Sequence, residues 1–380
     1  MTNITEIEFL ALNNRKAILY VPVSIYIGMT MIIGIIGNSL VCYIYGRMVK
    51  HTPTNCFILS LGIYDLICCG VTLPLEIVEM RYPYYYIETC KFQRLQITGT
   101  AIASGFILLA IAVDRYIRVC KPHKSKIESQ LAVKISILSG TLALAMSIPV
   151  VLIYGQHTYT LPKLNITVSE CSSTAENSRS VFPQIYYGFL FILFVVILIP
   201  LSILYGLIWR TLHMRKKTFS FSMTYLSASR NSFHNIAVNE VPLMLKQSKG
   251  KSKSNPTVNH IKGDPLQIRK STIEKKNRYQ FYKLKRTTFK LFLTTAFFTI
   301  SFLPYHALMI YRTVVSDFVN LEPAAELTYN LFLRSYQLYT LNPTVYAICD
   351  NKFWTQLSVL FPFCHCRGKE EKEDSEEVEN

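Results

Sequence analysis

Long apolar segments separated by short polar ones make up most of the chain. Seven of them carry at most one charge each and are close to the ~20 residues that a helix needs to cross a bilayer. They cover residues 21–45, 56–75, 95–113, 135–154, 181–209, 291–311 and 327–349. Apolar runs of this length are typical of membrane spans rather than of soluble core helices. The pattern therefore predicts an all-α membrane protein with a seven-transmembrane helix bundle.

The parts outside this bundle, which occupies 21–349, differ from it in composition. Residues 1–20 lack a convincing small-residue cleavage site, so we interpret the first apolar segment as a retained span that follows an N-terminal segment. A long third inner loop is expected at about 214–282, and its middle, SKGKSKSNPTVNH, has the composition of disordered chain. The acidic tail at 364–380 has such a composition as well.

The charge distribution sets an orientation for the predicted bundle. The net charge is +16, and half of the 380 residues are hydrophobic. Basic residues concentrate in alternate connections, which by the positive-inside rule places the N-terminus outside. The inner residues of this kind are Arg47, Lys50, Arg115, Arg118, Lys121, Lys124, Lys126 and Lys134. Two glycosylation sequons, at Asn3 and Asn165, fall on outer segments in agreement with this orientation.

A basic segment at 210–286 holds 18 of the 40 Lys and Arg residues. Such a segment can bind nucleic acid in a soluble protein. Between two spans on the inner side, it is more typical of contact with anionic lipid and a cytosolic partner. We therefore expect membrane lipids as partners and no nucleic acid.

The ten cysteines divide by compartment under this topology. Cys90 and Cys171 are the only two on outer connections, where the environment is oxidising, so we expect a disulfide between them. Cys364 and Cys366 follow an amphipathic stretch on the inner side and are candidates for palmitoylation, with free thiols as the alternative.

Polar side chains within the spans are candidate functional residues, because an ionisable group inside a bilayer costs ~2.5–3.5 kcal/mol on insertion scales. Asp65 lies near the middle of the second span, and Asn38 and Asn342 lie at similar depth. Together with Ser104 they could hold water or a small cation inside the bundle. The alternative is that Asp65 serves only helix packing.

Asp114 and Arg115 close the third span, followed by Tyr116. Charges at this position can simply anchor a helix at the membrane edge, and we interpret Arg118, Lys121 and Lys124 in this way. An acid and a base side by side can also form an ion pair that opens and closes.

In combination, these residues resemble the rhodopsin-like (class A) G-protein-coupled receptors over nearly the whole chain. The resemblance is carried by motifs in the family's order on the seven spans. They are GNSLV with Asn38, LSLGIYDL with Asp65, Cys90 placed 25 residues before Arg115 of the Asp-Arg-Tyr triplet, SFLPY, NPTVY, and Phe353 seven residues after Tyr346.

The resemblance implies a plasma-membrane receptor that binds an extracellular agonist and activates a heterotrimeric G protein, with receptor kinase and arrestin as further partners. It implies that Asp114 holds Arg115 in the resting state and that a short amphipathic eighth helix lies at 350–363. It implies no cofactor beyond an allosteric sodium ion at Asp65, Ser104 and Asn342. The implied coupling and activation residues are Asp114, Arg115, Tyr116, Tyr205, Phe298, Phe302, Pro304, Asn342, Pro343 and Tyr346.

The sequence departs from the family pattern at several positions. Phe302 stands where the family has a tryptophan before the sixth-span Leu-Pro. The rotamer change that the family assigns to this tryptophan is therefore expected at Phe302 together with Phe298. Tyr205 follows Pro200 by only five residues, and Leu338 replaces a polar residue near the sodium site, which weakens the expectation of sodium.

The ligand class is narrowed by two positions. The aspartate by which amine receptors pair with an ammonium group is matched here by Ile97, and the lysine by which opsins bind retinal is matched by Tyr336. The outer half offers mixed charges and aromatic groups, which suit a peptide. A non-peptide small molecule or odorant is the alternative. The candidate ligand-binding residues are Glu76, Glu79, Gln93, Arg94, Gln96, Ile97, Tyr305, His306, Arg312, Arg334 and Tyr336.

Two other functional classes fit the sequence less well. A transporter of this size would be expected to show an internal repeat, and none is present. An enzyme is not expected, because the sequence has no His-Glu-x-x-His or Gly-x-Ser-x-Gly motif and no second aspartate within the spans to pair with Asp65.

Overall fold

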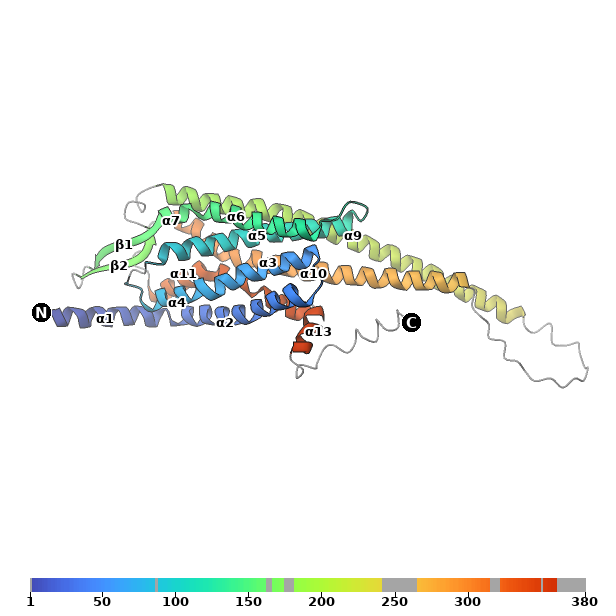
Figure 1. Cartoon of the computed structure of the whole chain (residues 1–380), viewed down its shortest axis with the longest axis horizontal. Helices are drawn as coiled ribbons and strands as arrows, with labels where there is room; N and C mark the ends of the chain where they lie inside the picture. The colour runs from blue at the N-terminus through green and yellow to red at the C-terminus, as the bar shows by residue number, and fades with distance from the viewer. Residues whose placement is uncertain are drawn as a thin grey trace, which may run out of the picture. The chain divides into compact units, whose positions relative to one another are not determined.

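The computed structural model describes residues 2–85, 88–161, 166–173, 181–240, 265–314, 322–349 and 351–360. The chain divides into two compact units, Met1–Tyr205 with Thr287–Asn380, and Gly206–Arg286. The first unit is a helix bundle, and every site described below lies in it (Figure 1).

The first stretch of the chain is helical with two π-helical turns. Its elements are α1 Thr2–Leu19, α2 Val21–Tyr43, η1 Ile44–Met48, α3 Pro53–Ile67, η2 Cys68–Thr72 and α4 Leu73–Arg81. The middle of the chain forms α5 Cys90–Cys120, α6 Ser129–Ser147, α7 Pro149–Ile153, β1 Tyr154–Leu161 and β2 Ile166–Ser173. The last part forms α9 Phe182–Glu240, α10 Pro265–Val314, α11 Pro323–Arg334, the 3₁₀ segment η4 Ser335–Leu341, α12 Asn342–Cys349 and α13 Asn351–Leu360.

Prolines set the start of several helices, because proline lacks the amide hydrogen that the first helical turn leaves unpaired. Pro53, Pro149 and Pro323 each stand at the first or second position of their helix. At the start of α3, the Thr52 hydroxyl also accepts a hydrogen bond from the Asn55 amide at 3.3 Å. This N-cap fixes where the second span begins.

Six helices within the described residues are long and apolar enough to cross a membrane. The seventh predicted span corresponds to α11, η4 and α12, in which a 3₁₀ stretch interrupts the α-helix. The predicted seven-helix bundle is confirmed by the comparison of folds given below. α13 lies where the sequence predicts the short amphipathic helix at 350–363.

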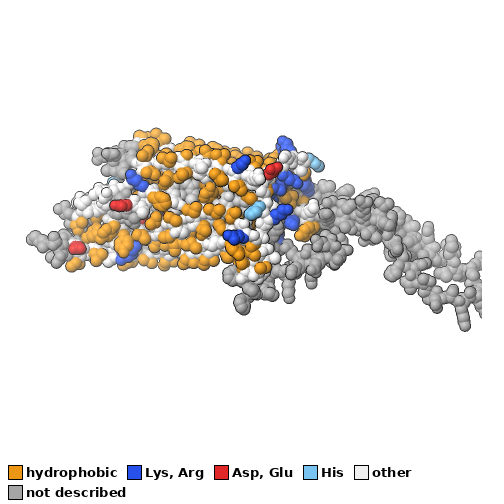
Figure 2. Space-filling model, in the orientation of Figure 1, with side chains coloured by type: hydrophobic (Ala, Val, Ile, Leu, Met, Phe, Trp, Pro, Cys, Tyr) orange, Lys and Arg blue, Asp and Glu red, His pale blue; other side chains and the backbone are white. Residues whose placement is uncertain are grey.

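Apolar side chains cover the middle of the bundle, as membrane-facing helices require (Figure 2). On α2, for example, Ile25, Met29, Ile32 and Ile36 form an exposed stripe at helical spacing. Lys and Arg side chains gather near the end of the bundle opposite the β-hairpin in the same view. This charge distribution agrees with the predicted topology, in which that end is the inner one.

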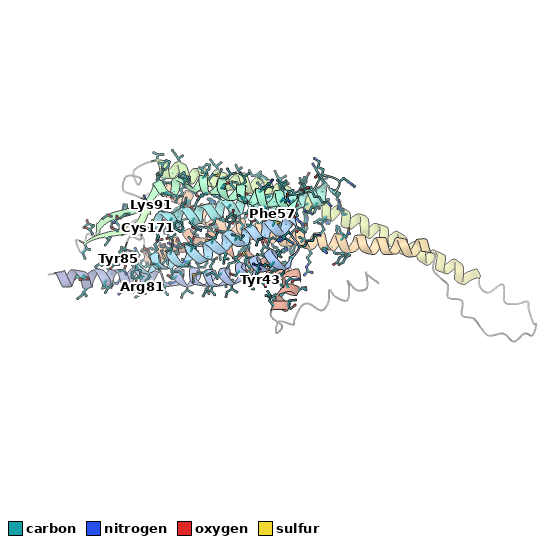
Figure 3. The ribbon with its side chains drawn as sticks, viewed as in Figure 1. Tyr43, Phe57, Arg81, Tyr85, Lys91 and Cys171 are labelled. Atoms are coloured by element: carbon teal, nitrogen blue, oxygen red, sulfur yellow. A yellow bond between two sulfur atoms is a disulfide. The ribbon has the colours of Figure 1, made fainter. Side chains whose placement is uncertain are left out.

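The inside of the bundle is organised around α5, which packs against α3, α6 and α7. Its buried side chains include Ile107, Leu108 and Ile111, which join a core cluster with Phe57 of α3 and Tyr346 of α12. Figure 3 shows Arg81 and Cys171 at the hairpin end of the bundle, and Tyr43 and Phe57 toward the other end.

Three segments differ from the sequence-based expectation. The outer connection at 154–173 forms an antiparallel hairpin, with Tyr154 opposite Ser173 and Leu161 opposite Ile166, so the prediction of purely helical structure missed it. Its Tyr, Thr, Val and Ile residues favour strands. The N-terminal segment is helical as α1. In the predicted inner loop at 214–282, α9 continues to Glu240 and α10 begins at Pro265, and the residues between them lie outside the described part.

Gly37 allows α2 to lie close to α12. A β-carbon added at Gly37 would come 2.6 Å from the β-carbon of Pro343. We therefore expect Gly37→Ala to destabilise the bundle by about 1–3 kcal/mol, the usual cost of overpacking. The thermal unfolding midpoint in detergent measures this loss. Gly28→Ala on the same helix is the matched control, because nothing lies within 4 Å of its added β-carbon; equal midpoints for the two variants would contradict the close-packing account.

Candidate functional site

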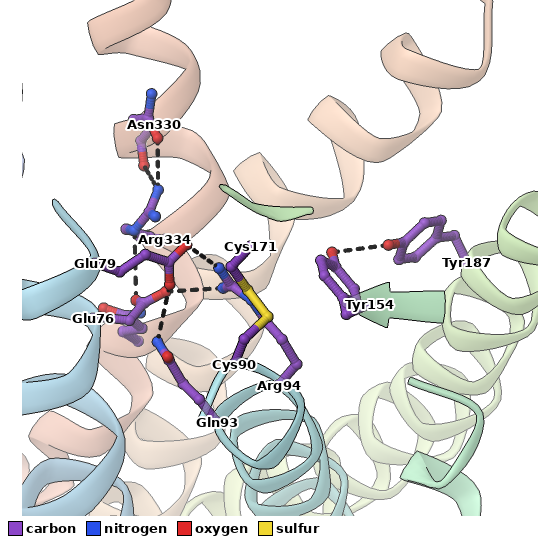
Figure 4. A network of polar contacts seen from close by, with 11 residues as sticks. Glu76, Glu79, Cys90, Gln93, Arg94, Tyr154, Cys171, Tyr187, Asn330 and Arg334 are labelled. Carbon is purple, nitrogen blue, oxygen red and sulfur yellow. Dashed lines mark hydrogen bonds and ion pairs between the residues drawn. A yellow bond between two sulfur atoms is a disulfide. The ribbon is translucent and has the colours of Figure 1, made fainter. Parts of the chain in front are cut away.

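The outer hairpin is fixed to the bundle by a disulfide. Cys90 is the first residue of α5, and Cys171 lies in β2 with its Cα 5.9 Å from that of Cys90. The predicted Cys90–Cys171 pairing is confirmed. The disulfide holds the hairpin beside the outer ends of α4 and α5, where the polar side chains described next are gathered (Figure 4).

A buried network of ion pairs joins α4 to α5. Arg94 donates to Glu76 at 3.0 Å and to Glu79 at 2.6 Å. Gln93 also donates to Glu79, at 3.3 Å. Glu76 is fully buried, whereas the side chains of Arg94 and Glu79 are 12% and 13% exposed. Arg94 and Glu79 are therefore the members of the network that remain slightly exposed.

The seventh helical segment completes this network. The Arg334 Nε lies 3.5 Å from Glu76 Oε2, and its NH1 group donates to Asn330 Oδ1 at 2.8 Å. Gln337 of η4 donates to the same Glu76 carboxylate. Glu76 therefore has partners on three other helical segments, α5, α11 and η4, and two glutamates balance two arginines inside the bundle. Such balance matters because an unpaired charge buried in a protein costs several kcal/mol.

Aromatic groups of the outer connection border this network. The Arg94 guanidinium lies 5.4 Å from the ring centroid of Tyr154, and the Tyr154 hydroxyl accepts a hydrogen bond from Tyr187 at 2.9 Å (Figure 4). Cation–π contact of this kind favours a partly desolvated arginine. The network thus links α4, α5, β1 and α9 at the outer end of the bundle.

An apolar cavity of about 80 Å³ lies among α5, α9, α10 and η4. Four predicted ligand-binding residues line it, namely Ile97, Tyr305, His306 and Tyr336. Phe194 and Phe302 also line it, with the Phe194 ring 4.5 Å from the His306 ring and 6.1 Å from the Phe302 ring. A small apolar or aromatic group is the kind of ligand part that such a cavity accepts.

The predicted ligand-binding residues thus divide into an ionic group and a cavity group, with two exceptions. Within the described residues, the Gln96 side chain makes no polar contact. Arg312 lies in α10, and its side chain is outside the described part. The sequence prediction missed Gln337, Asn330 and Tyr154. Gln337 and Asn330 lie within the seventh apolar segment, three and four residues from Arg334. On a helix this spacing places side chains on the same face, so it could have predicted both residues as neighbours of Arg334.

A second cluster outside the spans lies against the hairpin. Burial raises the pKa of Glu170, whose carboxylate accepts from the Tyr159 hydroxyl at 3.4 Å. Burial also raises the pKa of Tyr20, whose hydroxyl donates to Glu326 at 2.5 Å. Lys16 of α1 pairs with the same Glu326 at 2.6 Å, so α1 is tied to the start of α11.

The middle of the bundle contains the three residues of the predicted sodium site. Asn342 donates to Asp65 Oδ2 at 2.8 Å, and Asp65 is fully buried. The other Asp65 oxygen, the Ser104 hydroxyl and the Asn342 side-chain oxygen are buried with no hydrogen-bond partner among the described residues. A hard cation prefers oxygen ligands of this kind. These orphaned oxygens fit a sodium ion, although Leu338 supplies no ligand.

Aromatic rings connect the apolar cavity to this polar middle. The rings of Phe298 and Phe302 lie 4.6 Å apart on α10, and both contact Tyr339 of η4, at 5.9 and 5.8 Å. The Tyr339 hydroxyl lies 3.1 Å from that of Thr100 on α5. Pro304 interrupts the hydrogen bonding of α10 just outside this group. A ligand that moves Phe302 therefore acts directly on the contacts among α5, α10 and η4.

At the inner end of α5, Asp114 and Arg115 form a buried ion pair. Arg115 donates to Asp114 Oδ2 at 2.7 Å and to the Thr54 hydroxyl, which itself lies 3.1 Å from the same Asp114 oxygen. Arg118 donates to Asp114 Oδ1 at 2.9 Å. The interpretation of Arg118 as a surface anchor did not include this ion pair, in which the Arg118 side chain stays 24% exposed. Its spacing of four residues from Asp114 places both on one face of the helix.

Three other predicted switch residues, Tyr205, Tyr346 and Tyr116, lie near this inner end. The Tyr205 hydroxyl lies 3.2 Å from that of Thr295 and joins α9 to α10. Tyr346 of α12 is buried, with its ring 6.3 Å from that of Tyr45 in η1. The Tyr116 ring is half-buried and contacts Lys121. Thr54 and Tyr45 were missed, because nothing in the sequence around them marks either as a partner.

These features define a class of membrane protein, in which a seven-helix bundle has an ionic network and an apolar cavity toward its outer end and a buried ion pair at its inner end. The fold is that of the rhodopsins. The crystal structure of squid rhodopsin matches 96% of this chain and 92% of its own, with a TM-score of 0.65 at 19% sequence identity. Residues 37–346 match the 7 transmembrane receptor (rhodopsin family). The chain belongs to this family of receptors.

Several receptors are similar to the chain in sequence. Mouse (Mus musculus) neuromedin-U receptor 2 is 26% identical over 51% of this chain and 50% of its own length. Chicken (Gallus gallus) thyrotropin-releasing hormone receptor is 25% identical over 90% of this chain and 78% of its own. Rat (Rattus norvegicus) type-1 angiotensin II receptor A is 32% identical over 52% and 56%. The chain thus spans about half the length of the neuromedin-U receptors that it matches.

Proposed function

We propose that this protein is a plasma-membrane receptor that binds an extracellular peptide and activates a heterotrimeric G protein, with its N-terminus outside. The observation that carries this proposal is an ionic network, with Arg94 and Glu79 slightly exposed, beside an apolar cavity. A ligand that uses both must present charges and an apolar or aromatic group together, as short peptides do. Receptors named for neuromedin U, thyrotropin-releasing hormone and angiotensin II, which are peptide hormones, are similar to the chain.

The binding step is an exchange of charge partners. A charged group of the peptide competes for Glu79 or Arg94 at the rim, while an apolar side chain enters the cavity toward Phe302. Movement of Phe302 changes its packing on Phe298 and Tyr339, and α10 can bend at Pro304. The inner end of α10 then moves relative to α5, where Arg115 leaves Asp114 and Thr54 to meet the G protein. Coupling of this kind requires only that the ligand favour one of two bundle arrangements.

Guanine-nucleotide exchange in reconstituted membranes tests this proposal. The wild-type protein in nanodiscs is combined with purified G proteins of different subtypes and with a broad peptide panel. At least one peptide is expected to raise the exchange rate, and Arg115→Ala is expected to remove this rise while peptide binding persists. Absence of any peptide response, together with basal exchange that Arg115→Ala leaves unchanged, would contradict the proposal. A response to non-peptide compounds alone would favour the second candidate, a receptor for a small apolar molecule or odorant, which the apolar cavity could accommodate.

We further propose that sodium binds at Asp65, Ser104 and Asn342 in the resting state, where it would neutralise the buried carboxylate. Agonist affinity should then fall as sodium replaces potassium at constant ionic strength. Asp65→Asn is expected to abolish this sodium effect, because it removes the charge that attracts the ion. Radioligand competition in the two salts measures it. Ser104→Ala, which removes only a neutral oxygen, should reduce the effect without abolishing it; equal sodium sensitivity of Asp65→Asn and wild type would contradict this site.

The remaining partners and modifications are proposals that rest on the sequence and the family. They are glycosylation of Asn3 and Asn165, palmitoylation of Cys364 and Cys366, contact with membrane lipids, and regulation by receptor kinase and arrestin. The Asn3 side chain, Asn165, Cys364 and Cys366 lie outside the described residues.

A further inference from the structure

One lysine in the middle of α10, at the inner end of the sixth predicted span (291–311), lies inside the bundle. Lys290 is only 5% exposed, whereas Lys285 of the same helix is exposed. A buried ammonium group inside a membrane protein is costly unless other groups compensate its charge, so such a residue usually has a function. The contacts of Lys290 show which groups do this.

Two tyrosine rings face the Lys290 ammonium group. Its Nζ lies 5.5 Å from the ring centroid of Tyr346 and 5.8 Å from that of Tyr45. It also lies 3.5 Å from the Tyr45 hydroxyl oxygen, within hydrogen-bond distance. Both tyrosines are almost completely buried, at 1% and 2% exposed. Both distances fall within the range in which a cation is attracted to an aromatic face, and the attraction is strongest in desolvated sites such as this one.

The three residues come from separate parts of the bundle. Tyr45 belongs to the π-helical turn η1 after α2, Lys290 to α10, and Tyr346 to α12. Lys290 lies roughly 20 Å along the helix from Pro304, at 1.5 Å per residue. A bend at Pro304 would therefore carry Lys290 sideways, away from both rings.

We propose that Lys290 is a positioning residue that clamps the inner end of the sixth span, within α10, to Tyr45 and Tyr346 in the resting state. The clamp must open when α10 moves, so it sets the fraction of receptors that are active without agonist. This inference rests on the proposed receptor function only where nucleotide exchange is the measurement, because the clamp itself is a contact between helices. Together with the Asp114–Arg115 pair, it gives the resting bundle two separate restraints at its inner end.

Basal nucleotide exchange without agonist tests the clamp. Lys290→Met keeps the length of the side chain and removes its charge. It is expected to raise basal exchange about tenfold, which corresponds to ~1.4 kcal/mol. Lys290→Arg, which restores a cation able to stack on both rings, should return basal exchange to near the wild-type rate. Lys134→Met is the control, because it removes an exposed lysine charge from α6 at the same end of the bundle and should leave basal exchange unchanged.

Tyr45→Leu supplies an independent variant in case Lys290→Met fails to reach the membrane. It should also raise basal exchange. The basal exchange rate of the double variant, Tyr45→Leu with Lys290→Met, should be only slightly higher than that of the more active single variant, because both substitutions remove the same interaction. Unchanged basal exchange in well-expressed Lys290→Met would overturn the clamp. Basal exchange in Lys290→Arg as high as in Lys290→Met would overturn the role of the charge.

A distance measurement separates failure of the clamp from failure of the proposed function. Spin labels at the exposed positions Phe289 on α10 and Leu131 on α6 report the position of the inner end of α10 without any G protein. Lys290→Met should broaden the distance distribution toward longer values, and Lys290→Arg should not. A broadened distribution without exchange activity in any variant would leave the clamp in place and refute G-protein activation. Identical distributions for wild type and Lys290→Met would refute the clamp.

Discussion

Glu76→Gln is expected to lower the stability of the bundle by about 3–5 kcal/mol, the range found when one partner of a buried ion pair is removed. Glu76 is fully buried and faces both Arg94 and Arg334. Without the charge of Glu76, Arg334 loses its carboxylate partner, and Arg94 retains only Glu79. The measurement is the thermal unfolding midpoint of purified protein in detergent, together with the amount of folded protein in the membrane.

Two further variants show whether charge balance is the cause. Glu88 is an exposed glutamate on the same outer side, so Glu88→Gln should change the midpoint little. Removing Arg334 together with Glu76, as Glu76→Gln with Arg334→Gln, should recover most of the lost stability, since it removes charges in a pair. If Glu76→Gln were as stable as the wild type, the network would have no structural role.

Asp114→Asn is expected to raise basal nucleotide exchange by about tenfold or more. The Asp114 carboxylate accepts from Arg115 and Arg118 and contacts the Thr54 hydroxyl. Hydrogen bonds to a charged group contribute about 1.5–3 kcal/mol each, and a tenfold change needs only ~1.4 kcal/mol. Asparagine has nearly the same shape but no charge, so the change isolates the ionic part of the restraint on Arg115.

Glu128→Gln is the control for this prediction. Glu128 is an exposed acid on the inner side, just before α6, and its loss should leave basal exchange as it is. Basal exchange that stays at the wild-type rate in Asp114→Asn, with a normal response to agonist, would show that the ion pair does not restrain the receptor.

Most of the bundle could be predicted from the sequence, because a membrane span is encoded by the length of a continuous apolar segment. The Cys90–Cys171 disulfide followed from compartment, and the family motifs predicted the contacts of Asp65 with Asn342 and of Asp114 with Arg115. Each of these inferences rests on a local sequence pattern or on a residue type that is rare in its part of the chain. Structure that lacks such a pattern, including the 3₁₀ segment η4, was not predicted.

The partners of the site residues were harder to predict than the site residues themselves. Thr54 contacts Asp114 across 60 positions of sequence, and Gln337 reaches Glu76 across 261. Lys290 follows shortly after the basic segment at 210–286, in which a lysine predicts contact with solvent or lipid head groups. Only the packing of η1 and α12 against α10 places it between two rings. Such contacts depend on tertiary geometry, which neither hydropathy nor motif spacing encodes.

The central claim is that the outer pocket and the inner ion pair are two ends of one switch, and agonist affinity measures this most directly. By linkage, an agonist that promotes G-protein binding must itself bind more tightly when the G protein is present. In nanodiscs, nucleotide-free G protein is expected to tighten agonist binding by about 5–150-fold, the usual range of allosteric coupling. Arg115→Ala is expected to abolish this gain, because it removes the side chain that meets the G protein. An agonist affinity that is the same with and without G protein would contradict the account.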